Sequence, residues 1–143
     1  MIEIHRSALV LVPSHELYNL INDIEAYPQF LDGVAESRVL SASPTEMVGE
    51  LLIRKAGIER RLVTRNRLTA PERIEMTLED GPLDSLEGVW SIQSLNEQGC
   101  KVSLDLSFSA GRGLKSFTFN RVFKQVADSM VNAFVERAHA LSR

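Results

Sequence analysis

The C-terminal segment of this chain, residues 115–141, is predicted to form one long amphipathic helix after a run of strand-like segments. Apolar residues recur there at intervals of three and four, which places them on one side of a helix. At 1.5 Å per residue the helix would be about 40 Å long, enough to cross a small domain. A sheet made by the strands would be its packing partner, and incomplete closure would leave a pocket between them. The apolar stripe consists of Phe119, Val122, Phe123, Val126, Met130, Phe134, Ala138 and Leu141.

The preceding residues divide into strands and two short helical turns. Residues 2–12 are predicted to form a strand that Pro13 ends, and Ser14 is the predicted N-cap of a short helix. A second helical turn is expected around Pro28, followed by a turn at Gly33. Further strands are expected where apolar and β-branched residues alternate with turn residues, at 34–42, 46–55, 58–69, 73–79, 86–95 and 101–108.

The last of these strands shows the clearest alternation. Val102, Leu104, Leu106 and Phe108 share one face, and polar residues share the other. The short connections between strands favour antiparallel pairing, because parallel crossovers need a dozen or more residues. We therefore expect one α+β domain over residues 1–143, with about seven strands, two short helices after the first strand and a long C-terminal helix.

Composition restricts the class of protein. The chain has 143 residues, of which 44% are hydrophobic and 24% charged, as is usual for a soluble globular domain. A net charge of -3 argues against a dedicated nucleic-acid binder. The only cysteine, Cys100, excludes an internal disulfide. No apolar run approaches the roughly 18 residues of a membrane span, so we expect a cytoplasmic protein whose membrane contact, if any, is transient.

Chemistry-bearing residues are few. His5, His15 and His139 lack metal-ligand spacing, and no serine, histidine and aspartate set points to a triad. Cys100 has no histidine or second cysteine nearby in the sequence. We therefore expect no catalytic residue, no metal and no cofactor. The chain is predicted not to be an enzyme, and a cyclase-type activity is kept as an alternative.

Four motifs occur in the order found in a known family. They are Asp-Ile-Glu-Ala-Tyr-Pro-Gln-Phe-Leu at 23–31, Gly-Pro-Leu at 81–83, Leu-Glu-Gly-Val-Trp at 86–90 and Met-Val-Asn-Ala-Phe at 130–134. Over its whole length the chain resembles the coenzyme Q-binding START-domain family of the polyketide cyclase/dehydrase and lipid transport superfamily. The resemblance implies a helix-grip fold, as in START and birch-pollen-allergen-like proteins. In that fold a curved antiparallel sheet surrounds the C-terminal helix and leaves a hydrophobic cavity.

The resemblance also implies three competing functions. The first is non-enzymatic binding of ubiquinone or another polyprenyl lipid in the cavity, in support of respiration. The second is that of the ribosome association toxins in the family, which bind the large ribosomal subunit and block subunit joining. The third is a polyketide cyclase-like enzyme. The partners implied are thus a small hydrophobic ligand and the large ribosomal subunit.

The candidate ligand-binding residues are large or flexible side chains on the helix, the clearest strands and the family motifs. Core packing is an alternative explanation for each, and Tyr27 and Phe30 would equally anchor the small helices to the sheet. Alternation alone does not decide which face of the middle strands points inward. The predicted cavity residues are Tyr27, Phe30, Met76, Leu78, Trp90, Leu104, Leu106, Phe108, Phe119, Phe123, Val126, Met130 and Phe134.

A basic segment between residues 54 and 73 contrasts with the acidic chain. Arg61, Arg65 and Arg67 would share one face of a strand and would suit an RNA phosphate backbone or an anionic surface. A solvated outer face of the sheet is the alternative explanation, and it is the one that the sequence favours. No aromatic residues interleave them, which argues against recognition of single-stranded RNA.

Overall fold

The computed structural model describes residues 1–110 and 114–142, with side chains described outside residues 110–116. The chain begins with β1 (Ile2–Val10), α1 (Ser14–Asn22) and the 3-10 helix η1 (Ile24–Gln29). Six strands and the long helix follow. They are β2 (Val34–Ala42), β3 (Glu46–Lys55), β4 (Ile58–Thr69), β5 (Arg73–Asp80), β6 (Leu83–Asn96), β7 (Gly99–Ala110) and α2 (Leu114–Leu141).

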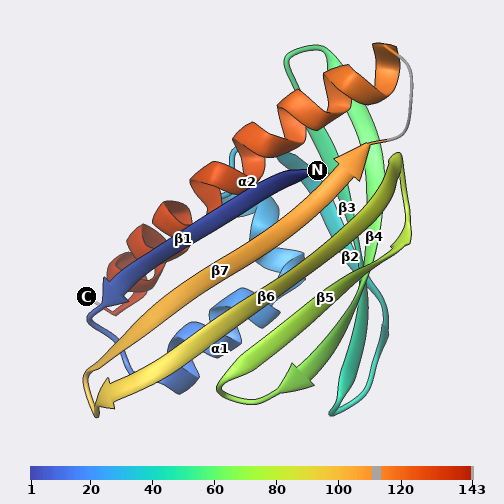
Figure 1. Cartoon of the computed structure of the whole chain (residues 1–143). Coiled ribbons are helices and arrows are strands. Elements are labelled where there is room, and N and C mark those ends of the chain that lie inside the picture. The colour runs from blue at the N-terminus through green and yellow to red at the C-terminus, as the bar shows by residue number, and fades with distance from the viewer. Residues whose placement is uncertain (111–113, 143) are drawn as a thin grey trace.

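In the described part of the chain, seven strands form one antiparallel sheet in the order β1-β7-β6-β5-β4-β3-β2. Strands β2 to β7 follow one another as a meander, and β1 joins the far edge beside β7 (Figure 1). Register shifts near Val34 and Val39, between β2 and β3, and at Val63, between β4 and β5, mark bulges that bend strands. The predicted α+β class and antiparallel sheet are confirmed.

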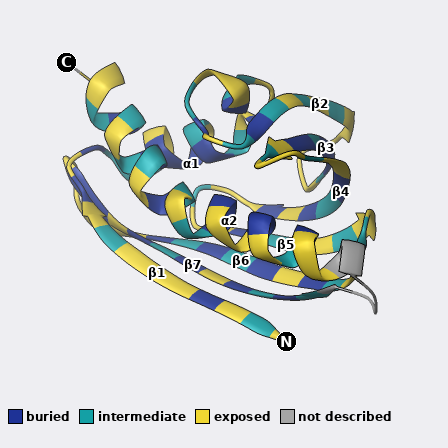
Figure 2. Ribbon diagram, turned by 90° about the horizontal axis from the view of Figure 1, so that it is seen from above, coloured by how far each residue is buried: buried dark blue, intermediate teal, exposed yellow. Residues whose placement is uncertain are grey.

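The sheet curves around α2, and α1 packs beside the helix (Figure 2). Helix α2 packs against β1, β7, β4 and α1. Most of its predicted stripe is buried, from Phe119 to Ala138. Met130 is only partly buried, and Leu141 is 61% exposed because it lies at the end of the helix. The helix-grip architecture therefore follows from one apolar stripe meeting one apolar face of a sheet.

Two local predictions near the N-terminus are wrong. Ser14 is the first residue of α1 and not its N-cap; Pro13 takes the N-cap position, and its carbonyl accepts hydrogen bonds from the N–H groups of Glu16 and Leu17. The first strand ends at Val10, because Val10 pairs with Cys100 at the start of β7 and the ladder stops there. The next residue, Leu11, donates its N–H to His139 Nε2 instead.

The turn at Gly33 attaches the sheet to α2. Gly33 has φ of +90°, a conformation that side chains disfavour, and a Cβ there would lie 2.6 Å from Val126 Cγ2. The Gly33 carbonyl accepts a hydrogen bond from the Arg54 N–H at 2.9 Å. Glycine is required here for both its backbone angle and its lack of a side chain.

Candidate ligand cavity between the sheet and the C-terminal helix

A cavity of about 60 Å³ lies on the inner face of the sheet, with α2 and η1 as its other walls. This volume has room for a few water molecules. Most of its surface is apolar, and the described residues that line it include no charged side chain. The lining consists of Ile24, Tyr27, Gly49, Leu51, Leu62, Thr64, Asn66, Met76, Leu86, Trp90, Leu104, Leu106, Phe123 and Met130.

Strand register explains why these side chains converge. Gly49 pairs with Thr64 and Leu51 with Leu62, so all four point to the same face of β3 and β4. Asn66 pairs with Met76, which in turn pairs with Gly88. The inner face therefore continues across the sheet from β3 to β6.

Two glycines on the inner face stand where a side chain would collide with its neighbours. A Cβ on Gly49 would lie 2.7 Å from Ile24 Cδ1 of η1. A Cβ on Gly88 would lie 2.8 Å from both Leu106 Cδ1 and Met76 Cε. Gly49 thus lets η1 approach the sheet, and Gly88 leaves room for two side chains that line the cavity.

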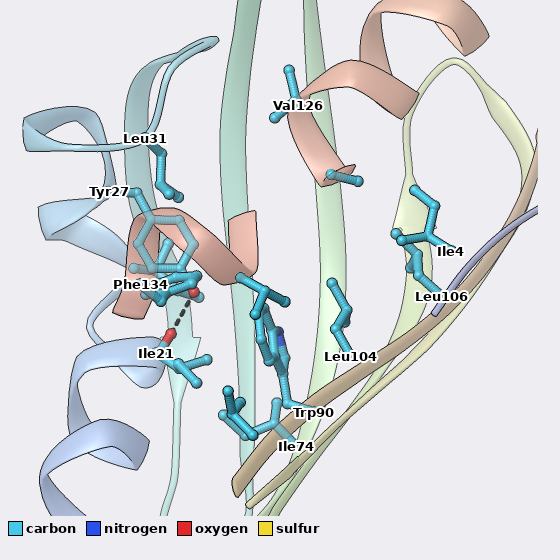
Figure 3. Packing of buried hydrophobic residues seen from close by; sticks show 14 of the residues in the cluster. Ile4, Ile21, Tyr27, Leu31, Ile74, Trp90, Leu104, Leu106, Val126 and Phe134 are labelled. Carbon is cyan, nitrogen blue, oxygen red and sulfur yellow. Dashed lines mark hydrogen bonds between the residues drawn. The ribbon is translucent and has the colours of Figure 1, made fainter. Parts of the chain in front are cut away.

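An aromatic cluster forms the wall of the cavity near α1 and η1. The ring of Phe134 lies 5.3 Å from each of the rings of Tyr27, Phe30 and Trp90, in edge-to-face geometry. Figure 3 shows Tyr27 and Phe134 together, with Trp90 rising from the sheet beside them. Such pairs add about 0.5–1.5 kcal/mol each beyond the area they bury. This cluster holds η1, β6 and α2 together.

The hydroxyl of Tyr27 is already engaged. It donates a hydrogen bond to the carbonyl of Ile21 at the end of α1 (Figure 3). Burial, and to a lesser degree the charge of Asp23, hold the pKa of Tyr27 well above its usual range. Tyr27 therefore stays a neutral phenol and does not act as a base.

Asn66 and Thr64 bring polar groups into the cavity. Asn66 is 5% exposed, and its Oδ1 atom is buried without a hydrogen-bond partner among the described residues. Thr64 lies two residues before it on the same face of β4 and is partly buried. The cavity is thus apolar with one small polar region, the pattern that ligand pockets commonly have.

The structure divides the predicted cavity residues into two groups. Those that line the cavity are Tyr27, Met76, Trp90, Leu104, Leu106, Phe123 and Met130. Phe30 and Phe134 belong to the aromatic cluster behind it, and Phe108 and Phe119 pack against Phe123. Val126 is buried, and a side chain on Gly33 would meet it, while Leu78 is partly buried on β5.

Sequence reasoning missed the part of the lining that comes from η1, β3, β4 and the start of β6. These residues are Ile24, Gly49, Leu51, Leu62, Thr64, Asn66 and Leu86. Leu62, Thr64 and Asn66 do alternate along β4, so a period of two was present in the sequence. On β3 it was hidden, because Val48 and Leu52 on the outer face are buried as well.

Arg61, Arg65 and Arg67 lie on the outer face of β4, as predicted, and each is paired with glutamate. Arg61 Nη1 lies 2.9 Å from Glu50 Oε1, and Arg67 Nη1 lies 3.8 Å from Glu75 Oε2. Arg65 pairs with Glu46 and, at 2.8 Å, with Glu79. The hydrogen bond from Arg65 lowers the pKa of Glu79. The face is therefore a mixed-charge network and not a purely basic patch.

A wider depression of about 330 Å³ lies elsewhere, lined in part by outer-face residues of the sheet. Its lining includes His5, Glu75, Glu87 and Asp105, and His5 Nδ1 lies 2.7 Å from Asp105 Oδ1. It is shallow and lined in part by charged side chains, so the smaller inner cavity, which has none among its described lining residues, is the better candidate for a hydrophobic ligand. Among the described residues, no three His, Cys, Asp or Glu side chains converge as metal ligands would. None of the described helices is long and apolar enough to cross a membrane.

Comparison with known proteins gives the family. The family described as polyketide cyclase / dehydrase and lipid transport matches residues 10–135. The chain belongs to this family. Ribosome association toxin RatA of Pseudomonas aeruginosa is similar to this chain over nearly its whole length. The two proteins are 42% identical over 138 residues, and the match covers 96% of each. RatA of Escherichia coli strain K12 is 41% identical, over 96% of this chain and 87% of that relative.

Solved structures share the fold of this chain. The Zhui aromatase/cyclase from Streptomyces is similar with a TM-score of 0.86 at 16% identity, over 99% of this chain and 96% of that one. A START superfamily protein from Mycobacterium smegmatis has a TM-score of 0.80 at 17% identity, over 97% and 98% of the two chains. The predicted helix-grip fold and the family resemblance are confirmed.

Proposed function

We propose that this chain binds a small hydrophobic ligand in the cavity between the sheet and α2, without chemical turnover. The observation that carries the proposal is the enclosed lining itself, which combines aliphatic, aromatic and thioether side chains with a single polar region. A buried CH₂ group contributes about 0.8 kcal/mol, so a site of this kind favours an apolar molecule. The family is one of polyketide cyclases, dehydrases and lipid transport proteins, and lipid transport agrees with this function.

The ligand class that we propose is ubiquinone or another polyprenyl lipid, and the process is respiration. The cavity of about 60 Å³ is much smaller than such a molecule, so binding requires side chains to move. Met76 and Met130, which are only partly buried, line the cavity from opposite sides, on β5 and α2. Methionine is unbranched and adapts to irregular shapes, so these two residues are the ones we expect to give way.

The lining favours binding over catalysis. Among the described lining residues there is no carboxylate, imidazole or thiol that would transfer a proton. Tyr27 is held neutral and donates its hydroxyl to Ile21. A cyclase reaction like that in the name of the Zhui neighbour would have to rely on Thr64 or Asn66, which are weak acids and bases.

Native mass spectrometry with lipid extraction, on protein purified from its own host, tests the ligand-binding proposal. We expect a co-purifying quinone or isoprenoid in the wild type, and its loss in Met130→Trp, which fills the cavity. Leu141→Trp is the matched control, because Leu141 lies on the same helix, is 61% exposed and does not line the cavity. An apolar ligand retained by Met130→Trp would contradict the proposed site.

Ribosome association is the second candidate function. The observation that favours it is whole-length similarity, at 41–42% identity, to relatives named ribosome association toxin. The chain would then act in the cytoplasm, bind the large ribosomal subunit and block subunit joining. We propose Arg61, Arg65 and Arg67 as contacts to RNA phosphates. The ion pairs of Arg65 and Arg67 with glutamate are exposed and worth about 0–1 kcal/mol each, so phosphate can replace those glutamates. Arg61 is exposed, but its partner Glu50 is buried, so a phosphate would bind Arg61 beside that pair.

Sucrose-gradient profiles of purified ribosomal subunits test this second function. We expect the wild type to reduce the 70S peak, and Arg61→Glu, Arg65→Glu and Arg67→Glu together to abolish the effect and its salt dependence. Met130→Trp should leave the effect unchanged if the outer face is the contact. A wild type without effect on the profile would contradict ribosome association, and an active triple variant would contradict the contact surface alone.

A further inference from the structure

One buried polar atom in the cavity has no partner in the described structure. Asn66 is only 5% exposed, and its Oδ1 atom accepts no hydrogen bond from the described residues. Leaving such an acceptor buried and unsatisfied is unfavourable by about 1–3 kcal/mol, and native proteins keep few of them. We therefore expect Asn66 Oδ1 to accept a hydrogen bond from a molecule that enters the cavity.

The surroundings of Asn66 restrict what that partner is. Asn66 lies between Met47 of β3 and Met76 of β5 in the strand register, on the inner face of the sheet. Beyond Thr64, the rest of the lining is almost entirely apolar, and none of the described lining residues is charged. A carboxylate or phosphate headgroup would thus be desolvated without a counter-charge, which is strongly unfavourable. The polar part of the ligand must be neutral and small.

The aromatic residues restrict the ligand further. Tyr27, Trp90 and Phe123 line the same cavity and present flat rings to its contents. A planar ring fits against such side chains better than a flexible chain does, because ring pairs have preferred stacked and edge-to-face geometries. The group that donates a hydrogen bond to Asn66 is therefore expected to be a substituent of a planar ring.

We infer that Asn66 is the specificity-determining residue of the cavity, and that its carboxamide oxygen accepts a hydrogen bond from a hydroxyl group on a neutral aromatic ring. The ligand class is a phenol or hydroquinone with an apolar substituent; of the two redox forms of the proposed quinone ligand, only the reduced one, the quinol, carries such a hydroxyl. This inference rests on the proposed ligand-binding function and adds the hydrogen-bond donor to it. A bound water molecule is the competing partner, since the cavity has room for one.

Three matched probes separate a ligand hydroxyl from a bound water molecule as the partner of Asn66. The first is 4-butylphenol, which can donate a hydrogen bond. The second is 4-butylanisole, whose ether oxygen cannot donate one, and the third is butylbenzene, which has no oxygen. Binding is followed by the fluorescence of Trp90, the only tryptophan in the chain, which lines the cavity. We expect the wild type to bind the phenol about five- to tenfold more tightly than either other probe, as one net hydrogen bond would give. Asn66→Leu should reduce the phenol to the level of butylbenzene and leave butylbenzene unchanged or tighter.

Asn120→Leu is the matched control. The Oδ1 atom of Asn120 is also buried without a described partner, but Asn120 lies on α2 and does not line the cavity. It should leave the preference for the phenol intact. If Asn66→Leu does not fold, Asn66→Ala makes the same comparison, because it also removes the carboxamide.

Two results would overturn the inference. The first is equal affinity of the wild type for the three probes, or a preference for the phenol that survives in Asn66→Leu. Either outcome would mean that the carboxamide binds a water molecule or has a structural role. The hydrophobic ligand site would still stand. Failure of the wild type to bind any of the probes, with no co-purifying ligand, would overturn the proposed ligand-binding function together with this inference.

Discussion

Gly88 on β6 and Met76 on β5 are paired across the sheet, and a Cβ on Gly88 would stand 2.8 Å from the terminal methyl of Met76. The thioether of Met76 thus occupies space that only glycine at position 88 leaves free. The width of the cavity therefore depends on this pair.

Gly88→Ala is therefore expected to narrow the cavity. The added methyl group must displace Met76 and Leu106, which costs about 1–3 kcal/mol of stability by overpacking and reduces ligand affinity. Fluorescence titration and urea unfolding measure the two effects. Gly99→Ala is the control, since Gly99 is the first residue of β7 and a Cβ there meets nothing closer than 3.5 Å. Equal ligand affinity in the two variants would show that Gly88 does not set the width.

Phe134→Ala should be among the most destabilising single changes in the chain. Its fully buried ring contacts Tyr27, Phe30 and Trp90, so truncation removes three aromatic contacts and leaves a void. We expect a loss of about 3–5 kcal/mol in the free energy of unfolding, measured by urea denaturation. Phe117→Ala, at a position 64% exposed on the same helix, should change it by less than about 0.5 kcal/mol. A loss below 1 kcal/mol for Phe134→Ala would mean that the cluster repacks.

Gly33→Ala tests the close approach of the sheet to α2. Gly33 and Gly57 both have positive φ, +90° and +80°, so alanine is strained at either position. A Cβ at Gly33 would lie 2.6 Å from Val126 Cγ2, whereas one at Gly57 would have no neighbour within 4 Å. We expect Gly33→Ala to lower the free energy of unfolding by about 1–3 kcal/mol more than Gly57→Ala does. The melting temperature of the Gly33 variant should be lower for the same reason. Equal losses of stability in the two variants would mean that the strained backbone angle alone, and not the contact with Val126, destabilises the protein.

Alkaline pH should destabilise the protein in part through Tyr27. Its pKa is raised in the folded state by burial and by Asp23, so above the ordinary pKa of 10.0 the unfolded chain loses the phenol proton and the folded chain keeps it. The unfolded state then binds fewer protons, and stability falls as pH rises, by up to about 1.4 kcal/mol per pH unit for one group.

Tyr27→Phe is expected to flatten this decline. Urea unfolding at pH 8 and at pH 11 gives the two stabilities for each protein. Tyr18 has a raised pKa from burial as well, so part of the decline should persist. At pH 8 the variant should be less stable than the wild type by about 1–3 kcal/mol, because the carbonyl of Ile21 loses its donor. An unchanged pH slope would mean that Tyr27 titrates equally in both states.

Most element boundaries could be predicted because the turn residues and the alternation agree. The strands β2, β3 and β4 begin and end where the pattern placed them. The N-cap was wrongly predicted at Ser14, because the carbonyl of Pro13 begins the helix without any side-chain cap. The cavity was harder to predict. Val48 and Leu52 lie on the outer face of β3, opposite Arg65 and Arg61, and are nevertheless buried, so apolar residues occur on both faces of this strand.

Asn66 is the clearest case of a residue that sequence could not place. A polar residue in an alternating strand is normally read as solvent-facing, and only the pairing of Asn66 with Met76 shows that it points inward. The same register explains why Arg61, Arg65 and Arg67, at the other parity, were placed on the outer face correctly.

The pairing of β1 with β7 has a consequence for the order of folding. Ile4 lies opposite Leu106, so the first strand has its partner about a hundred positions later in the chain. Contacts that span so much sequence form slowly, while the hairpins from β2 to β7 join neighbours and can form early. During synthesis the first strand therefore stays without a partner strand until β7 has left the ribosome.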